Sequence, residues 1–247
     1  MRSRVFVCVA ATLFLVASGC RSRRTGPNDA YLDPTVSAEA WNDLFAAHGR
    51  ELYDKRDVVV RLAAVTPGMS VADIGAGTGV FTMMLSDAVG PTGRVYAEEV
   101  LGKFSKYIAE AAVDAGRTNV VSVVGTERSV GLPPDSIDLA FLCDVYHHFD
   151  HPEEMLGSIR RALHERGEVL LIEFRREPGS APWVFEHVRA GEEEVLGEFE
   201  KAGFVRLARD DSLRDSYVWR FRRDEQADAR PAASEATARG EDRALAP

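Results

Sequence analysis

The sequence predicts an α/β domain built on a doubly wound, mostly parallel β-sheet. Between residues 71 and 221, short apolar segments typical of strands alternate with amphipathic segments typical of helices. This is the order in which parallel strands and their crossover helices follow one another. The first of these strands ends in a carboxylate and runs directly into a glycine-rich turn. The chain has 247 residues, of which 45% are hydrophobic, which suffices for the core of one such domain.

The pattern also places the individual elements. Strands are expected at 71–74, 94–97, 120–124, 137–142 and 169–173, with a closing pair at 204–208 and 217–221. Helices are expected at 41–62, 81–89, 103–115, 152–163 and 192–202. Asp150 and Glu153 are expected to form a capping box on the helix at 152–163. Gly203 is expected to end the helix at 192–202.

The turn after the first strand is the most informative segment. Asp73 stands two residues before Gly75, and Gly77 and Gly79 follow at alternate positions. Glycines allow positive φ and let a ligand approach the backbone closely. The G-x-G-x-G spacing differs from the G-x-G-x-x-G fingerprint, with which dinucleotide sites bind a pyrophosphate at a helix N-terminus. A carboxylate at the mouth of the turn favours an ammonium or sulfonium cation over a phosphate, so the sequence predicts a cradle for a cationic small molecule.

This turn resembles motif I of the class I S-adenosylmethionine-dependent methyltransferases. The order of the predicted elements resembles that family over residues 58–222, and the details resemble its type 11/25 and quinone-biosynthesis members. The resemblance implies a Rossmann-like, seven-stranded sheet with one antiparallel strand and helices on both faces. It also implies that S-adenosyl-L-methionine is the methyl donor, and that the helical segment before the domain forms a lid over this cofactor.

The resemblance further implies roles for residues at the strand ends. Asp73 would hold the methionyl ammonium group, and Glu99 would accept hydrogen bonds from both ribose hydroxyls, because two carboxylate oxygens match a vicinal diol. Glu127 would accept from the adenine amino group. Glu98 would point away from the ribose, because neighbouring strand residues face opposite sides. The expected cofactor-binding residues are Asp73, Gly75, Ala76, Gly77, Thr78, Gly79, Thr82, Glu99, Val100, Thr126, Glu127 and Asp144.

The segment after the fourth strand contains the candidate catalytic residues. It resembles the D-x-x-H-H stretch of quinone-biosynthesis and related methyltransferases, with Asp144 lining the methyl-transfer channel. His148 is expected either to act as a base near neutral pH or to pack and cap the next helix. His147 and His151 raise the question of a metal ion. No further Cys, His or carboxylate recurs at ligand spacing, so no metal is predicted.

The N-terminus predicts export. Residues 1–20 combine a basic start, about a dozen apolar residues and a small-residue end, too short for a stable membrane span. They resemble a bacterial lipoprotein signal peptide in which Cys20 is lipidated, with simple secretion or an uncleaved anchor as alternatives. A tether is expected at 21–36, a helical lid at 37–62, the methyltransferase domain at 63–223 and a disordered tail at 224–247. The expected location is the cell envelope, as a periplasmic or outer-membrane lipoprotein, and anchoring on the cytoplasmic side is the alternative.

The sequence therefore predicts S-adenosylmethionine-dependent methyl transfer to a small-molecule acceptor. A net charge of −9 disfavours nucleic acid as a partner. Because the donor is made in the cytoplasm and the leader predicts export, a non-catalytic binding or scaffold protein of the cell envelope is the alternative. Such a protein would retain affinity for S-adenosylmethionine or S-adenosylhomocysteine. A nicotinamide-dependent dehydrogenase is disfavoured by the spacing of the glycines.

Overall fold

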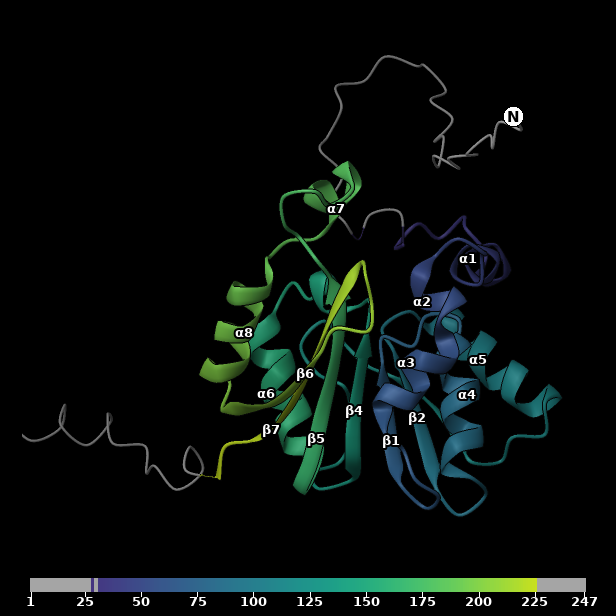
Figure 1. Ribbon diagram of the computed structural model, residues 1–247. Helices are drawn as coiled ribbons and strands as arrows, with labels where there is room; N and C mark the ends of the chain where they lie inside the picture. The colour runs from purple at the N-terminus through teal and green to yellow at the C-terminus, as the bar shows by residue number, and fades with distance from the viewer. Residues whose placement is uncertain (1–27, 29–30, 226–247) are drawn as a thin grey trace, which may run out of the picture.

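The computed structural model describes residue 28 and residues 31–225 of the chain. In this part of the chain, seven strands form one sheet in the order β3-β2-β1-β4-β5-β7-β6, with helices on both faces (Figure 1). The leader expected at 1–20 lies outside the described residues, as do most of the tether expected at 21–36 and nearly all of the tail expected at 224–247. The strands are β1 (Ser70–Ile74), β2 (Arg94–Glu99), β3 (Val120–Val124), β4 (Ile137–Cys143), β5 (Leu163–Phe174), β6 (Phe204–Asp210) and β7 (Ser216–Arg223).

The topology confirms the predicted fold class. Strands β1 to β5 pair in parallel, and β7 pairs antiparallel with both β5 and β6. The strand order reverses between β1 and β4, which pair directly although two strands separate them in the sequence. In open sheets of this kind, ligands bind beyond the carboxyl ends of the strands at such a reversal. The glycine turn after β1 lies at this point.

Eight α-helices and one short 3₁₀ helix occur in the described residues. The helical segment expected at 41–62 is divided into three short helices, and Gly49 in the break has a φ of 97°. The helix α7 was not predicted, because six residues are too few for a periodic pattern. No helix of the described part is long and apolar enough to span a membrane. The helices are α1 (Ala38–Phe45), α2 (Glu51–Asp54), α3 (Arg56–Ala63), α4 (Val80–Val89), α5 (Gly102–Asp114), η1 (Tyr146–His148), α6 (Pro152–Ala162), α7 (Pro182–His187) and α8 (Glu192–Lys201).

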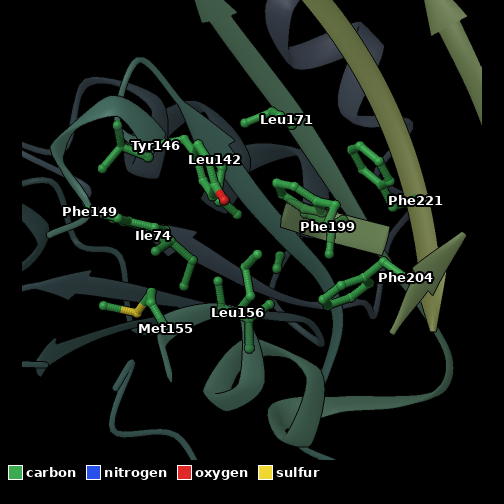
Figure 2. Packing of buried hydrophobic residues seen from close by; sticks show 14 of the residues in the cluster. Ile74, Leu142, Tyr146, Phe149, Met155, Leu156, Leu171, Phe199, Phe204 and Phe221 are labelled. Carbon is green, nitrogen blue, oxygen red and sulfur yellow. The ribbon is translucent and has the colours of Figure 1, made fainter. Parts of the chain in front are cut away.

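Two apolar layers hold the helices to the sheet. On one face, Leu142 and Leu171 pack with buried residues of α6 and α8, including Phe199 (Figure 2). On the other face, their strand neighbours Phe141 and Leu170 pack with buried residues of α3 and α4. Successive strand residues point to opposite faces, and strands buried on both faces read as continuous apolar runs. This explains why residues 139–143 of β4 and 169–172 of β5 are continuously apolar and do not alternate between apolar and polar residues.

The structure contradicts the prediction for the N-terminus of α6 and confirms the prediction for the C-terminus of α8. The capping box expected at Asp150 and Glu153 is wrong, because the N-cap of α6 is His151 and no side chain caps the helix. The Asp150 carboxylate instead accepts a hydrogen bond from Asn28 Nδ2 (3.3 Å). Pro152 occupies the first turn of α6, where its missing N–H costs no hydrogen bond. The glycine after α8 is confirmed, since Gly203 has a φ of 81° and its N–H donates to the Glu200 carbonyl oxygen (3.0 Å).

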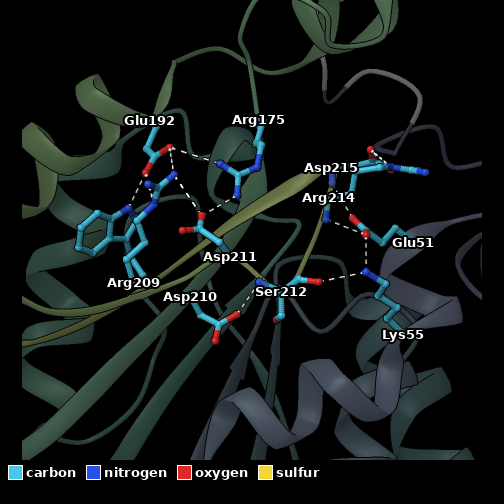
Figure 3. A network of polar contacts seen from close by, with 11 residues as sticks. Glu51, Lys55, Arg175, Glu192, Arg209, Asp210, Asp211, Ser212, Arg214 and Asp215 are labelled. Carbon is cyan, nitrogen blue, oxygen red and sulfur yellow. Dashed lines mark hydrogen bonds and ion pairs between the residues drawn. The ribbon is translucent and has the colours of Figure 1, made fainter.

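A polar network fastens α2 to the loop between β6 and β7 (Figure 3). The Glu51 carboxylate accepts from the backbone N–H groups of Arg214 (2.8 Å) and Asp215 (2.7 Å). Lys55 Nζ donates to the Ser212 carbonyl oxygen (3.0 Å) and forms an ion pair with Glu51 (2.9 Å). The helix α2 and Lys55, which follow Gly49, are therefore held by the loop between β6 and β7.

Candidate functional site

The glycine turn after β1 requires its glycines. Gly75, Gly77 and Gly79 have φ values of 63°, 58° and 84°, a region that L side chains rarely adopt. A Cβ atom on Gly75 would lie 2.2 Å from Val145 Cγ2, and one on Gly77 would lie 3.0 Å from Phe45 Cε2. Gly79 is also the N-cap of α4. The glycines are therefore required where the backbone of the turn packs closely against Val145 and Phe45.

Three carboxylates are buried together around this turn. Asp73, Glu98 and Glu99 are 4%, 2% and 1% exposed. The backbone N–H of Gly75 donates to Glu98 Oε2 (3.2 Å) and that of Gly77 donates to Glu99 Oε2 (3.0 Å). Among the described residues, no Lys or Arg side chain forms an ion pair with any of the three. The site therefore concentrates negative charge that a positively charged ligand would neutralise.

Burial and the neighbouring negative charges raise the pKa of these carboxylates. Burial, with a contribution from Glu99, raises the pKa of Asp73 to about 7, although Thr82 Oγ1 donates to Asp73 Oδ2 (2.6 Å). Burial and Glu99 also raise the pKa of Glu98 to about 8. Glu98 Oε1 is buried without a hydrogen-bond partner in the described structure. Glu98 is therefore a buried acid of the site that is mostly protonated near pH 7, rather than a solvated carboxylate.

The N-terminal segment covers the turn. The Tyr31 hydroxyl donates to Glu99 Oε2 (2.8 Å), and its ring stacks on that of Phe104 with centroids 4.8 Å apart and planes 17° apart. Thr78 Oγ1 donates to Asn42 Oδ1 of α1 (3.1 Å). Burial raises the pKa of Tyr31, so the hydroxyl stays protonated and remains a donor to the carboxylate. Tyr31 comes from the segment expected to be only a tether, so this segment contributes a side chain to the site.

Asp144 lies beside the turn, at the carboxyl end of β4. Its φ is 59°, and Arg50 Nη2 from the N-terminal region donates to its Oδ2 (2.6 Å). Burial raises the pKa of Asp144 to about 6, while His147 and Arg50 act in the opposite direction. Arg50 thus reaches the site that the sequence analysis expected the lid to cover.

The 3₁₀ helix η1, which follows Asp144, carries His147 and His148. His147 Nδ1 donates to Glu173 Oε1 of β5 (2.9 Å), and both side chains are 1% exposed. His148 Nδ1 lies 2.5 Å from Asn28 Oδ1. Burial, together with His147 and His187, lowers the pKa of His148 to about 2, which makes its imidazole a weak base in this conformation. The role of His148 as a base stays a prediction.

The structure gathers most of the predicted residues at one edge of the sheet. Asp73, the glycine turn, Thr82, Glu99 and Asp144 lie close together, as their hydrogen bonds and charge interactions show. Val100 is 37% exposed, and Thr126 and Glu127 lie in an exposed turn closed by hydrogen bonds between Thr126 and Ser129. Sequence reasoning missed Tyr31, the His147–Glu173 pair and the approach of His187 from α7. Contacts between such distant segments leave no periodic signal in a single sequence.

Comparison with known proteins agrees with this geometry. Residues 72–171 match the family model described as a methyltransferase domain. The chain is 29% identical over 140 residues to the ubiquinone/menaquinone biosynthesis C-methyltransferase UbiE of Ectopseudomonas mendocina, covering 56% of this chain and 54% of that protein. The UbiE protein of Pseudomonas fluorescens is 29% identical over 136 residues, covering 55% of this chain and 52% of that protein. The chain thus spans about half the length of the curated relatives it matches.

Solved structures show the same fold. A S-adenosylmethionine-dependent methyltransferase from Aquifex aeolicus aligns with a TM-score of 0.66 and 24% identity, over 75% of this chain and 98% of that one. A TehB-like S-adenosylmethionine-dependent methyltransferase from Corynebacterium glutamicum aligns with a TM-score of 0.56 and 18% identity, over 75% and 95%. Residues 72–171 are therefore a methyltransferase domain, on the fold of S-adenosylmethionine-dependent methyltransferases, and these likenesses support S-adenosyl-L-methionine as the methyl donor.

Proposed function

We propose that this chain transfers the methyl group of S-adenosylmethionine to a small-molecule acceptor bound beyond the carboxyl ends of β4 and β5. The observation that carries the proposal is the cluster of buried carboxylates around a glycine turn, in a domain of this family. The names of the curated relatives, which are C-methyltransferases of quinone biosynthesis, support a small-molecule acceptor.

The residues of the site fit the donor. We expect Asp73 to pair with the methionyl ammonium group and Glu99 to accept from the ribose hydroxyls. Two carboxylates without a cationic partner in the described structure suit a cation and a diol. Glu98, whose Oε1 has no partner in the described structure, would add negative charge beside them once a bound cation lowers its pKa. When bound, the sulfonium supplies an already activated methyl group. The chain then has to align the acceptor and exclude water, which the covering segment with Tyr31 and Arg50 is positioned to do.

Aromatic side chains beside the histidines support an acceptor with apolar surface. The Trp183 ring packs edge-on against Phe174 at the end of β5, with centroids 4.9 Å apart. Trp183 is 46% exposed and Phe185, also on α7, is 43% exposed. Exposed aromatic groups close to a polar site are typical of ligand-binding surfaces. We therefore expect a partly aromatic or aliphatic acceptor rather than a highly charged one.

The proposal is tested by titration and turnover. Calorimetry with S-adenosylmethionine and S-adenosylhomocysteine is expected to show one site for each, and labelled donor is expected to label a small molecule in cytosolic or envelope extracts. Binding of both compounds without label transfer to any extract would favour the non-catalytic binding protein instead. Absence of binding would reject the donor site.

The buried carboxylates predict that the ligand-free protein loses stability as the pH rises. Asp73 and Glu98 have pKa values of about 7 and 8 in the folded chain, against about 4 in an unfolded chain. Between about pH 4 and pH 8, the folded state therefore binds more protons than the unfolded state, and the free energy of unfolding falls as the pH rises. Urea unfolding at pH 5 and pH 8 is expected to show this fall, and Glu98→Gln is expected to reduce it. The stabilisation by S-adenosylmethionine is expected to be larger at pH 8, because the cation requires ionised carboxylates.

Tyr31→Phe is expected to strengthen cofactor binding. The Tyr31 hydroxyl uses Glu99 Oε2, an oxygen that a ribose hydroxyl would need, so the ligand must displace it. Removing the hydroxyl keeps the ring on Phe104 and removes a competitor worth about 1 kcal/mol, a gain of about fivefold in affinity. Tyr107→Phe, which removes the hydroxyl of another tyrosine, on α5, serves as the control. Weaker binding by the Tyr31 variant would show that the hydroxyl contacts the bound cofactor instead.

We further propose that the chain is anchored in the cell envelope through Cys20. The support is the leader pattern of residues 1–20, which ends in Ser18, Gly19 and Cys20. Cys20→Ala is expected to move the protein from the membrane to the soluble fraction, while Cys143→Ala is expected to leave its distribution unchanged. Equal membrane partitioning of wild type and the Cys20 variant would contradict lipidation.

A further inference from the structure

Three imidazoles from two separate segments meet at the carboxyl end of β5. His147 and His148 belong to η1, and His187 is the last residue of α7. Their ring centroids are 4.1 Å (His147 to His148), 4.9 Å (His147 to His187) and 5.0 Å (His148 to His187) apart. One ligating nitrogen of each lies within 4.8 Å of the others. The chain contains six histidines, so half of them gather at this place.

The hydrogen bonds of this cluster leave ligating nitrogens available. A carboxylate only accepts hydrogen bonds, so His147 Nδ1 must donate to Glu173, and its Nε2 is left. His147 Nε2 is buried and has no hydrogen-bond partner in the described structure, on a side chain that is 1% exposed. An unsatisfied polar atom in such a position costs free energy that a ligand there would recover. His148 shows the same arrangement, since its Nδ1 lies 2.5 Å from the carbonyl oxygen of the Asn28 amide.

In protein metal sites, imidazole ligands are oriented in the same way, by a hydrogen bond from the ring nitrogen that does not bind the metal. A metal-binding histidine donates its other ring N–H to a carboxylate or carbonyl oxygen, which sets the tautomer and raises the basicity of the ligating nitrogen. Glu173 is itself held by the backbone N–H groups of His147 (3.1 Å) and Phe174 (2.7 Å). A second possible set, Asp144 with His147 and Glu173, is less suitable, because Asp144 is engaged by Arg50 and Glu173 by these donors.

We propose that His147, His148 and His187 form a binding site for one divalent transition-metal ion of the Zn²⁺ type. Three imidazoles suit Zn²⁺, and a three-ligand set leaves a fourth position open. Tetrahedral coordination needs nitrogens about 3.4 Å apart, which small rotations of the half-buried His148 and His187 rings can supply. The sequence predicts no metal ion, because no further ligand recurs near these histidines at ligand spacing. The further ligand is His187, on a helix that the sequence did not predict.

The position of the site suggests the class of acceptor, a step that rests on the proposed function. His147 contributes to the electrostatics of Asp144, so the site adjoins the end of β4 where methyl transfer is expected. His148 and His187 are only half-buried, which leaves the open position accessible to a ligand. An acceptor with an oxygen or nitrogen donor, such as a phenol or an enolate-forming carbonyl compound, would complete the coordination and be held in register with the donor.

The test measures metal binding directly on the full chain in mild detergent after chelator treatment. Calorimetry with ZnCl₂ is expected to give one site, and ZnCl₂ is expected to raise the unfolding temperature. Co²⁺ in its place is expected to show the visible absorption of a tetrahedral site without a thiolate charge-transfer band, which excludes binding by the cysteines. His187→Ala, the most accessible ligand, is expected to weaken Zn²⁺ binding by at least about 100-fold, and Glu173→Gln by about tenfold.

Two histidines outside the cluster provide matched controls. His48→Ala and His164→Ala are expected to bind Zn²⁺ like wild type. Wild-type protein that binds no Zn²⁺ at micromolar concentration, or a folded His187→Ala variant that binds it unchanged, would overturn the proposal. Titration with S-adenosylmethionine separates the two proposals. Zn²⁺ binding without cofactor binding would reject methyl transfer and keep the metal site, and the reverse result would reject the metal site alone.

Discussion

Gly75→Ala is expected to destabilise the domain and abolish cofactor binding. A methyl group at this position would have to adopt a φ of 63° and would lie 2.2 Å from Val145 Cγ2. The left-handed conformation costs about 1–2 kcal/mol and the overpacking about 1–3 kcal/mol. We expect the free energy of unfolding to fall by about 2–5 kcal/mol in urea titrations. We also expect the affinity for S-adenosylmethionine to fall by at least about 100-fold, because relieving the overlap must displace the backbone of the cradle.

The matched control is Gly90→Ala, at the end of α4. Gly90 has nearly the same φ, 65°, but no atom lies within 4 Å of the position of its Cβ. Its ψ of −174° lies in a region that is essentially restricted to glycine, so this variant carries backbone strain without the overlap. It is expected to lose about 1–3 kcal/mol of stability while binding the cofactor normally. Equal effects of the two substitutions on cofactor binding would show that the turn after β1 is not the cradle.

Glu99→Gln is expected to weaken cofactor binding with little effect on folding. The substitution removes one negative charge and keeps an oxygen that can accept from Gly77 and Tyr31. Hydrogen bonds to a charged acceptor are worth about 1–3 kcal/mol, so calorimetry is expected to show a 5- to 150-fold loss of affinity for S-adenosylmethionine. The amide nitrogen would then face the Leu101 N–H, which donates to Glu99 Oε1 (3.1 Å), so the free energy of unfolding is expected to fall by about 1 kcal/mol.

The control for this substitution is Glu110→Gln on α5. Its side chain is 64% exposed and pairs only with Lys106 one helical turn away. It removes the same charge from the protein without touching the site, and wild-type affinity is expected. A Glu99→Gln variant that also binds the cofactor like wild type would mean that the ribose is held elsewhere.

Local patterns explain which parts of the fold could be predicted. The strands β1 and β4 are apolar runs ending in Asp73 and Asp144, and the turn glycines follow the first of them at fixed spacing. Because parallel strands end at the same edge of the sheet, reading the strand ends placed Asp73, Glu99 and Asp144 together. The family resemblance implied one antiparallel strand, and the structure shows that it is β7 of the closing pair. Periodicity alone does not reveal the direction of a strand.

The contact of Tyr31 with Glu99 could not be predicted by these patterns. Tyr31 reaches Glu99 from a stretch without apolar periodicity, and its contact depends on tertiary packing against Phe104. The capping box at Asp150 had the right local spacing, but the competing contact with Asn28 comes from far away in the sequence. The approach of His187 to His147 likewise depends on a short helix whose position only the folded chain defines.

The attachment of α2 by Glu51 divides the N-terminal region into a base held by the loop between β6 and β7 and an arm held at the site by Glu99 and Thr78. Two peptide N–H groups and Lys55 hold the base, whereas Gly49 joins it to the arm that carries Tyr31. Exchange of spent donor for fresh donor would require this arm to release Glu99 and Thr78, a sub-global opening far smaller than unfolding of the domain. Amide hydrogen exchange is accordingly expected to be faster in 31–48 than in 51–63.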